Sequence, residues 1–258
     1  MLKTRIIPTL LYKDFGLVKD KGFLSKRRVG DVLQTVRVYG LREVDELVLL
    51  DIAATLSGCG PDFALIDDVA DECFMPLTVG GGVKCLDDIR NLLMVGADKV
   101  AINSAAIDDL DLISKAADAF GSQCVVVSID VWQHEDGRRE VYSHSGTKPT
   151  GHSPVDWARL LEQRGAGEIL LTSINRDGMM TGYDIELIRD VSDAVSIPLI
   201  ASGGAGSYDD LVQAVLGGGA SAVAAASMFH FTEQTPLLAK RYMADAGIPV
   251  RFSRKELS

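Results

Sequence analysis

Short apolar runs alternate with amphipathic stretches along the whole chain. Eight runs rich in continuous Val, Ile and Leu predict β-strands, at residues 5–11, 46–51, 76–80, 99–103, 124–130, 168–174, 198–203 and 222–227. Continuous rather than alternating apolarity is typical of parallel strands that are buried on both faces. Between these runs lie helical patterns, such as residues 209–219, where apolar side chains recur on one face. Eight β-then-α units in about 250 residues predict a (β/α)8 TIM barrel, an α/β fold. A doubly wound open sheet is the alternative, although its usual strand count is lower.

An internal repeat supports the barrel. Residues 76–106 and 198–228 share an order of apolar run, glycine cluster, Asp-Asp pair, helix and second strand. The segments "DELVLLDI" and "GEILLTSI" also match, which sets Glu46 opposite Glu168, and in this register Leu11 corresponds to Asp130. The period is half of the chain, so the barrel is expected to consist of two duplicated half-barrels, neither of which could bury its sheet alone. No linker divides the chain, and we expect a single domain over residues 1–258.

Composition narrows the functional classes. The formal net charge of −10 argues against nucleic acid or an anionic membrane as a partner. Four cysteines form no CxxC pair and have no histidine at ligand spacing, so we expect reduced core thiols and no metal site. No apolar run approaches transmembrane length, and the first residues lack a secretion signal. A cytoplasmic location is expected.

Glycines and small polar residues follow several of the predicted strands. In a (β/α)8 barrel the chemistry lies at the C-terminal ends of the strands. Glycines let backbone N–H groups approach a phosphate, and small hydroxyl residues and helix N-termini complete such an anion site. A need for tight turns would by itself explain a single glycine cluster. Because the clusters occur in both halves of the chain, we favour two phosphate-binding sites, which would suit a substrate with a phosphate at each end. The segments are residues 80–82, 102–104, 177–178, 202–206 and 225–227.

Several motifs carry a resemblance to a known family. With "RIIP", "DELVLLDI", "TVGGGV", "GADKVAINSAA" and "GAGEILLTSINRDG", the chain resembles the cyclase subunit family of imidazole glycerol phosphate synthase over essentially its whole length. That family is a duplicated (β/α)8 barrel joined to a glutaminase subunit. The resemblance implies that ammonia released by the glutaminase crosses the barrel and is used at its C-terminal face, without a cofactor.

The resemblance assigns site residues by position. Asp130 matches one of the family's two catalytic aspartates. The first phosphate site falls on Gly82, Asn103 and Ser104. The second falls on Asp177, Gly178, Gly204, Ala226 and Ser227.

The resemblance also implies a gate for ammonia at the N-terminal end of the barrel, formed by Arg5, Glu46, Lys99 and Glu168. Each of them lies at the start of an apolar strand, and two cations and two anions cancel, which is the usual condition for buried charge. A purely structural ring of salt bridges is the alternative. Asp98 matches the position that contacts the glutaminase, whereas a solvated loop acid is its alternative.

Leu11 departs from the family pattern. The second catalytic aspartate belongs at this position, and leucine can neither accept nor donate a proton. The segments "LLYKDFGLVK" and "CFMPLTVGGGVK" resemble a group of paralogues encoded beside surface-polysaccharide genes. On this basis we expect a subunit that channels ammonia for amidination of an N-acetyl sugar, with a glutaminase and an N-acetyl-sugar amidotransferase as partners. Two alternatives are the cyclase subunit in histidine biosynthesis, with an altered acid/base arrangement, and a non-catalytic scaffold that activates a glutaminase.

Overall fold

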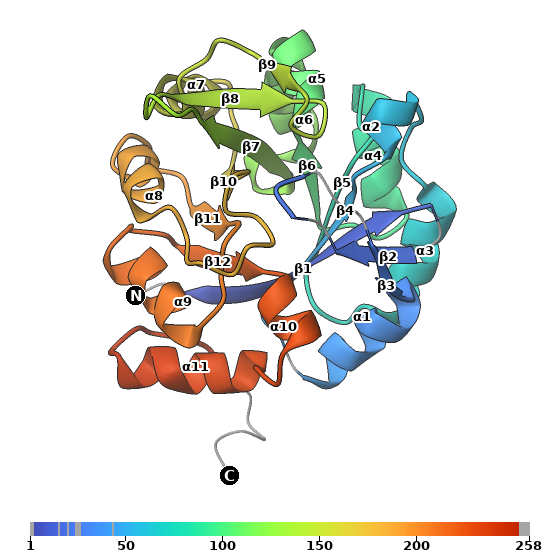
Figure 1. The fold of residues 1–258 in the computed structure, drawn as a ribbon. Coiled ribbons are helices and arrows are strands. Elements are labelled where there is room, and N and C mark those ends of the chain that lie inside the picture. The colour runs from blue at the N-terminus through green and yellow to red at the C-terminus, as the bar shows by residue number, and fades with distance from the viewer. Residues whose placement is uncertain (1–2, 15, 20, 24–26, 43, 253–258) are drawn as a thin grey trace.

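Eight parallel strands close into a barrel in the computed structural model, which describes residues 3–14, 16–19, 21–23, 27–42 and 44–252. The strands surround a common centre and the helices lie outside them, so the predicted (β/α)8 barrel is confirmed (Figure 1). Each of these eight barrel strands matches one of the predicted runs, and the last of them pairs with the first. In ring order they are β1 (Arg5–Lys13), β4 (Leu47–Asp51), β5 (Leu77–Gly80), β6 (Lys99–Ile102), β7 (Val125–Gln133), β10 (Glu168–Ser173), β11 (Leu199–Ser202) and β12 (Ala222–Ala225).

A helix follows each barrel strand. Several begin at a side-chain cap: Asp31 accepts a hydrogen bond from the backbone N–H of Gln34, and Asp184 accepts one from Leu187. The longer helices are α1 (Val32–Leu41), α3 (Phe63–Glu72), α4 (Leu86–Met94), α6 (Asp111–Phe120), α7 (Pro154–Gln163), α8 (Ile185–Ser192), α9 (Tyr208–Leu216) and α11 (Pro236–Asp245). Shorter ones are α2 (Ala54–Ser57), α5 (Ser104–Asp108), η1 (Ser122–Cys124) and α10 (Ser227–Phe231).

The duplication is visible in matching local structure. Both α4 and α9 begin with a capping box, in which the Asp at the third helical position accepts from the N-cap N–H. In one half Asp88 accepts from Cys85 at 3.2 Å, and in the other Asp210 accepts from Ser207 at 2.8 Å. These helices follow β5 and β11, the strands that the sequence repeat aligns.

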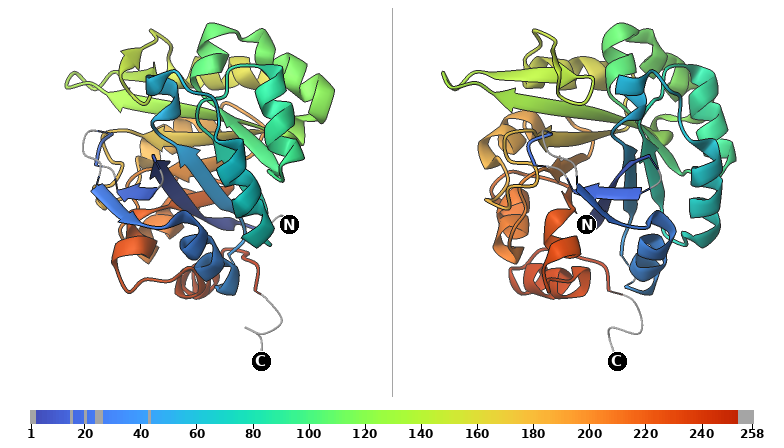
Figure 2. Two further views of the ribbon diagram at one scale, coloured as in Figure 1. Left: turned by 90° about the vertical axis from the view of Figure 1, so that its right-hand side faces the viewer. Right: turned by 45° about the vertical axis from the view of Figure 1, so that its right-hand side comes forward.

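Each half also carries an antiparallel extension of its first strand. β1 and β7 are both nine residues long and continue beyond the barrel. The extension of β1 pairs with β2 (Gly16–Lys19), which pairs with β3 (Arg27–Gly30). The extension of β7 pairs with β8 (Arg139–Ser143), which pairs with β9 (Lys148–Pro149). Figure 2 shows the hairpin of β7 and β8 extending from the barrel.

The barrel interior has its own apolar layer, separate from the larger core between the strands and the helices. This layer divides the inside of the barrel into two ends with different chemistry. Charged side chains lie at the N-terminal end, and an open cavity lies at the C-terminal end. The buried residues of the layer are Ile7, Val48, Ala101, Val126, Leu170, Ile200, Ala222 and Ala224.

The cysteines correct one expectation. All four are free, but none is a core residue: Cys59 and Cys85 are exposed, and Cys73 and Cys124 are partly buried. The reason is their placement in loops, at a helix end and in the short helix η1, where the chain lies near the surface. The expectation of core thiols was therefore wrong.

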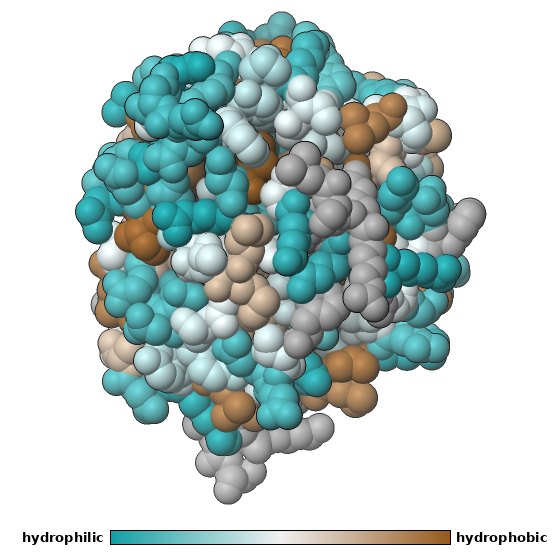
Figure 3. Space-filling view, in the orientation of Figure 1, coloured by the Kyte–Doolittle hydropathy of each residue, from teal (hydrophilic) through white to brown (hydrophobic). Residues whose placement is uncertain are grey.

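The surface on the face of Figure 3 is mostly hydrophilic, with hydrophobic side chains scattered over it. Within the described ranges, no helix is long and apolar enough to cross a membrane. In the same part of the chain, no group of three or more His, Cys, Asp or Glu side chains could hold a metal ion.

Candidate active site

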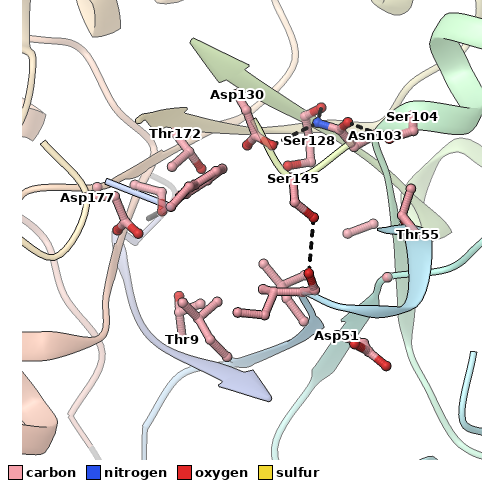
Figure 4. A pocket seen from close by; sticks show the side chains of 18 of the residues that line it. Thr9, Asp51, Thr55, Asn103, Ser104, Ser128, Asp130, Ser145, Thr172 and Asp177 are labelled. Carbon is pink, nitrogen blue, oxygen red and sulfur yellow. Dashed lines mark hydrogen bonds between the residues drawn. The ribbon is translucent and has the colours of Figure 1, made fainter. Parts of the chain in front are cut away.

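A cavity of about 330 Å³ opens at the C-terminal ends of the barrel strands (Figure 4). It gathers residues from both halves of the chain, because the loops after the strands converge there. All of the residues that the sequence assigned to catalysis or phosphate binding line it: Gly82, Asn103, Ser104, Asp130, Asp177, Gly178, Gly204, Ala226 and Ser227.

The first group, which we call cradle A, consists of Gly82, Asn103 and Ser104, after β5 and β6. Gly82 has a φ of +72°, and a Cβ there would lie 2.8 Å from the Cβ of Ala54, so only glycine fits at this point of the cavity wall. The Ser104 hydroxyl donates to Asn103 Oδ1 at 3.2 Å and accepts from the backbone N–H of His144 at 2.9 Å. Cradle A is therefore tied to the turn that follows β8, the strand paired with the extension of β7.

The second group, cradle B, lies after β10, β11 and β12. Gly204 has a φ of +116°, and a Cβ there would collide with the carbonyl oxygen of Gly182. The backbone N–H of Gly182 in turn donates to the Gly204 carbonyl oxygen at 2.9 Å. Only a glycine fits this close approach of two backbone segments. The members of cradle B are Asp177, Gly178, Gly204, Ala226 and Ser227.

Asp130 lies on β7, beside cradle A. Its Oδ2 accepts a hydrogen bond of 3.1 Å from the Asn103 side-chain amide. Burial raises the pKa of this carboxyl to about 7, the negative charge of Asp177 also raises it, and a hydrogen bond from Ser128 acts in the opposite direction. A carboxyl with a pKa near 7 is present in both protonation states at neutral pH, so it can act either as an acid or as a base.

Leu11 also lines the cavity, and strand pairing agrees with the register read from the sequence. Leu11 on β1 pairs with Leu50 on β4, and Asp130 on β7 pairs with Thr172 on β10. Leu50 and Thr172 are equivalent in the repeat, since each lies four residues after the glutamate that precedes or starts its strand. Leu11 therefore occupies the same position in its half-barrel as Asp130 does in the other.

Several cavity residues escaped the sequence reasoning, and Lys84 and Thr9 are two of them. Lys84 lines the cavity near cradle A, and its ammonium donates to the carbonyl oxygen of Gly58 at 2.6 Å. A comparison of the two repeats could have identified Lys84, because it is a charged residue at a position where the second repeat has a glycine, Gly206. Thr9 has a buried hydroxyl oxygen for which no hydrogen-bond partner occurs in the described part of the chain. Nothing in the sequence distinguishes this threonine from others in apolar strands.

Four charged side chains close a ring at the opposite end of the barrel. Arg5 contacts Glu46 at 2.6 Å and also pairs with Glu168. Lys99 Nζ lies 3.0 Å from Glu46 Oε2 and 2.8 Å from Glu168 Oε2. Thr78 adds a hydroxyl that donates to Glu46 Oε1 at 2.8 Å. The structure thus brings together the four residues predicted to form a gate, with cations and anions alternating.

The ring is mostly withdrawn from solvent. The side chains of the two glutamates are 2% and 7% exposed, and those of Arg5 and Lys99 are 25% and 20% exposed. Burial lowers the pKa of Arg5, but the hydrogen bonds and charges of Glu168 and Glu46 raise it above its ordinary value. Asp98 lies beside Lys99 at the surface, and its Oδ2 accepts from the backbone N–H of Leu77 at 2.8 Å.

Comparisons with known proteins agree with this geometry. A family model described as "Histidine biosynthesis protein" matches residues 5–235. Two relatives from strains of Caulobacter vibrioides are each 52% identical over 253 residues, covering 98% of this chain and 97% of the relative. Both are named imidazole glycerol phosphate synthase subunit HisF.

These relatives overturn the expectation of sugar amidination. The match extends over nearly the whole of both chains, and the relatives carry the name of the histidine-pathway synthase. The expectation gave one substitution, Leu11, more weight than the retained site. Leucine removes one proton-transferring group, but Asp130 and both cradles remain in the cavity. The predicted N-acetyl-sugar amidotransferase partner depended on the expectation of sugar amidination, and the comparisons give no support for it.

Proposed function

The chain belongs to the histidine biosynthesis protein family, and from that premise we propose that it is the cyclase subunit of an imidazole glycerol phosphate synthase. It would use ammonia from a glutaminase subunit to close an imidazole ring on a ribulosyl substrate that carries a phosphate at each end. The observation that carries this proposal is Asp130, a buried carboxyl with a pKa of about 7 in a cavity that both cradles line.

Ring closure with ammonia requires protons to be removed and returned at the reacting atoms. A group with a pKa near the working pH serves both steps, because it readily changes its protonation state. Leu11 supplies no polar atom on the other wall of the cavity. We therefore assign both proton transfers to Asp130, which would act first as a base and then as an acid.

The two cradles would hold the ends of the substrate. In cradle A, Gly82 leaves backbone open to the phosphate, and Ser104 and Lys84 add a hydroxyl and a positive charge. In cradle B, the backbone at Gly204 and the Ser227 hydroxyl would do the same. Because the cradles belong to different half-barrels, binding both ends would place the middle of the substrate beside Asp130.

The ring of Arg5, Glu46, Lys99 and Glu168 would act as the ammonia gate. Support comes from its position at the N-terminal end, directly below the apolar layer of the interior. An apolar layer favours neutral ammonia over the ammonium ion, because burying an unpaired charge costs far more. A glutaminase subunit docked at this end, with Asp98 in the contact, would deliver ammonia to the ring.

Purified chain mixed with an ammonium salt and the histidine-pathway ribulosyl substrate tests the proposal. We expect imidazole glycerol phosphate to form, and we expect Asp130→Asn to reduce its rate by about two to four orders of magnitude. Asp118→Asn, on the exposed face of α6, is the matched control and should keep the wild-type rate. If wild type and Asp130→Asn formed product equally slowly while the chain still activated a glutaminase, the chain would be a scaffold and not a cyclase.

A further inference from the structure

A chain of hydrogen bonds connects cradle A with Asp130. The backbone N–H of His144 donates to the Ser104 hydroxyl at 2.9 Å, and this hydroxyl donates to Asn103 Oδ1 at 3.2 Å. The Asn103 amide nitrogen then donates to Asp130 Oδ2 and to the Ser128 carbonyl oxygen, both at 3.1 Å. Figure 4 shows these side chains next to one another on one wall of the cavity. In this chain of bonds, Asn103 thus stands between the serine of cradle A and the catalytic carboxyl.

The other half-barrel has an apolar residue at the position equivalent to Asn103, and so lacks this chain of hydrogen bonds. Asn103 caps α5, and the residue that caps α10 in the second half is Ala226. Their backbones are similar, with φ and ψ of −117° and −87° at Asn103 and −111° and −72° at Ala226. In the first case β6, which leads to Asn103, pairs with β7, which carries Asp130. In the second case β12, which leads to Ala226, pairs with β1, which carries Leu11. Ala226 and Leu11 are therefore the equivalents of Asn103 and Asp130. The duplication therefore holds a polar pair in one half and an apolar pair in the other.

An anion in cradle A would compete with Asn103 Oδ1 for the hydrogen bond that the Ser104 hydroxyl donates. A serine hydroxyl has one proton to donate, and that of Ser104 points at Asn103 Oδ1. Donating it to a phosphate or sulfate oxygen takes it away from Asn103. The amide then loses the donor that fixes its orientation, and its own N–H groups can turn toward the anion. Asp130 would lose a hydrogen bond that stabilises its charged form.

We propose that Asn103 is a positioning residue through which anion binding in cradle A increases the proton affinity of Asp130. The proposal rests on the proposed function, in which cradle A holds a substrate phosphate and Asp130 transfers the protons. Its consequence is that the carboxyl holds its proton more firmly when the substrate is in place.

Other groups around Asp130 do not supply this coupling. Asp177, from the loop after β10, acts on Asp130 through its negative charge. Tyr142 on β8 and Thr172 on β10 pair with Asp130 through the backbone ladders. The other charged or titratable side chains that line the cavity can shift the pKa of Asp130 only through space: Asp51, Lys84, Asp108, Asp109 and His144. A direct effect of the anion's charge would also act through space, so a test must separate it from a route through Asn103.

The test follows the titration of the Asp130 carboxyl by carbon NMR in the full chain, with and without inorganic sulfate. Sulfate is chosen because its charge is constant across the relevant pH range. In wild type we expect sulfate to raise the pKa by about one unit, the effect of losing one charge-assisted hydrogen bond. In Asn103→Ala, at sulfate concentrations shown by calorimetry to saturate the variant, we expect a higher pKa without sulfate and little further change with it. Alanine is compatible with this backbone, as Ala226 shows.

Two serine variants serve as a matched pair. Ser104→Ala removes the hydroxyl at the start of the route and should reduce the sulfate effect, whereas Ser221→Ala, an exposed serine just before β12 and outside the cavity, should leave it as in wild type. The proposal is wrong if sulfate does not move the Asp130 titration in wild type, or if Asn103→Ala shows the full wild-type shift. No turnover is involved, so these results are independent of whether the cyclase assay succeeds.

Discussion

Leu11 and Asp130 lie on opposite strands of the barrel. β1 and β7 are separated by three strands in either direction around the ring, and both residues line the cavity at its C-terminal end. The two positions are equivalent in the duplicated halves, yet one carries a hydrocarbon and the other a carboxyl. Of these two equivalent positions, only the one on β7 carries a side chain that can transfer a proton.

Restoring a carboxyl at position 11 should increase cyclase activity. Leu11→Asp would place a second acid or base across the cavity from Asp130, so that one group no longer serves both steps. A positioned acid or base contributes about 10²- to 10⁴-fold, and we expect a gain of at least about tenfold. The rate of imidazole glycerol phosphate formation from ammonium measures it. Leu11→Asn has nearly the same shape without a proton to exchange, and an equal gain there would refute the explanation.

Opening the charged ring should uncouple the two reactions of the complex. Lys99 holds both Glu46 and Glu168, so Lys99→Ala leaves two buried carboxylates with one cation. We expect more glutamate released per product formed with glutamine, while free ammonium still supports the reaction. Lys115→Ala removes an exposed lysine that pairs with Asp109 and is the control. A ratio near one in the Lys99 variant, with normal folding, would show that the ring is only structural.

Removing the cation of cradle A should weaken anion binding there. Lys84 is exposed, so its attraction for a phosphate is screened and modest. We expect Lys84→Ala to reduce the affinity for inorganic phosphate about two- to fivefold at low salt, with the difference fading at high salt. Titration calorimetry at two salt concentrations measures it, with Arg159→Ala on the outer helix α7 as the control. Equal losses in the two variants would indicate an effect of net charge and not of the site.

Asp130 should make stability depend on pH. Its pKa is about 7 in the folded chain, and about 3.9 is the ordinary value in an unfolded one. Between these values the folded state holds more protons, so the free energy of unfolding should fall as the pH rises from about 4 to 7. The total is up to about 4 kcal/mol. The Asp130→Asn variant should lack this pH dependence. Denaturant unfolding at several pH values should therefore show the free energy of unfolding of the variant rising relative to that of wild type as the pH increases from about 4 to 7. Parallel curves for both proteins would contradict the raised pKa.

The sequence was most informative where one physical pattern governs many residues. Continuous apolar runs identify buried parallel strands because every side chain of such a strand faces either the barrel interior or a helix. The repeat then supplied the register, so that the equivalence of Leu11 and Asp130 follows from the order of residues alone. The cradle glycines were visible for the same reason, since a close backbone approach leaves a recognisable residue type.

Only the tertiary structure decided how the individual polar groups pair. That Asn103 donates to Asp130, and that Ser104 is held by His144, depends on loops from different strands meeting at one wall of the cavity. The pKa of Asp130 likewise depends on its burial and on Asp177, which lies 47 positions further along the chain. The alternation of charges around the ring has the same origin, because four strand starts must come together before Lys99 can reach both glutamates. Periodicity along the chain records which side of a strand is buried, but pairwise distances arise only when the barrel closes.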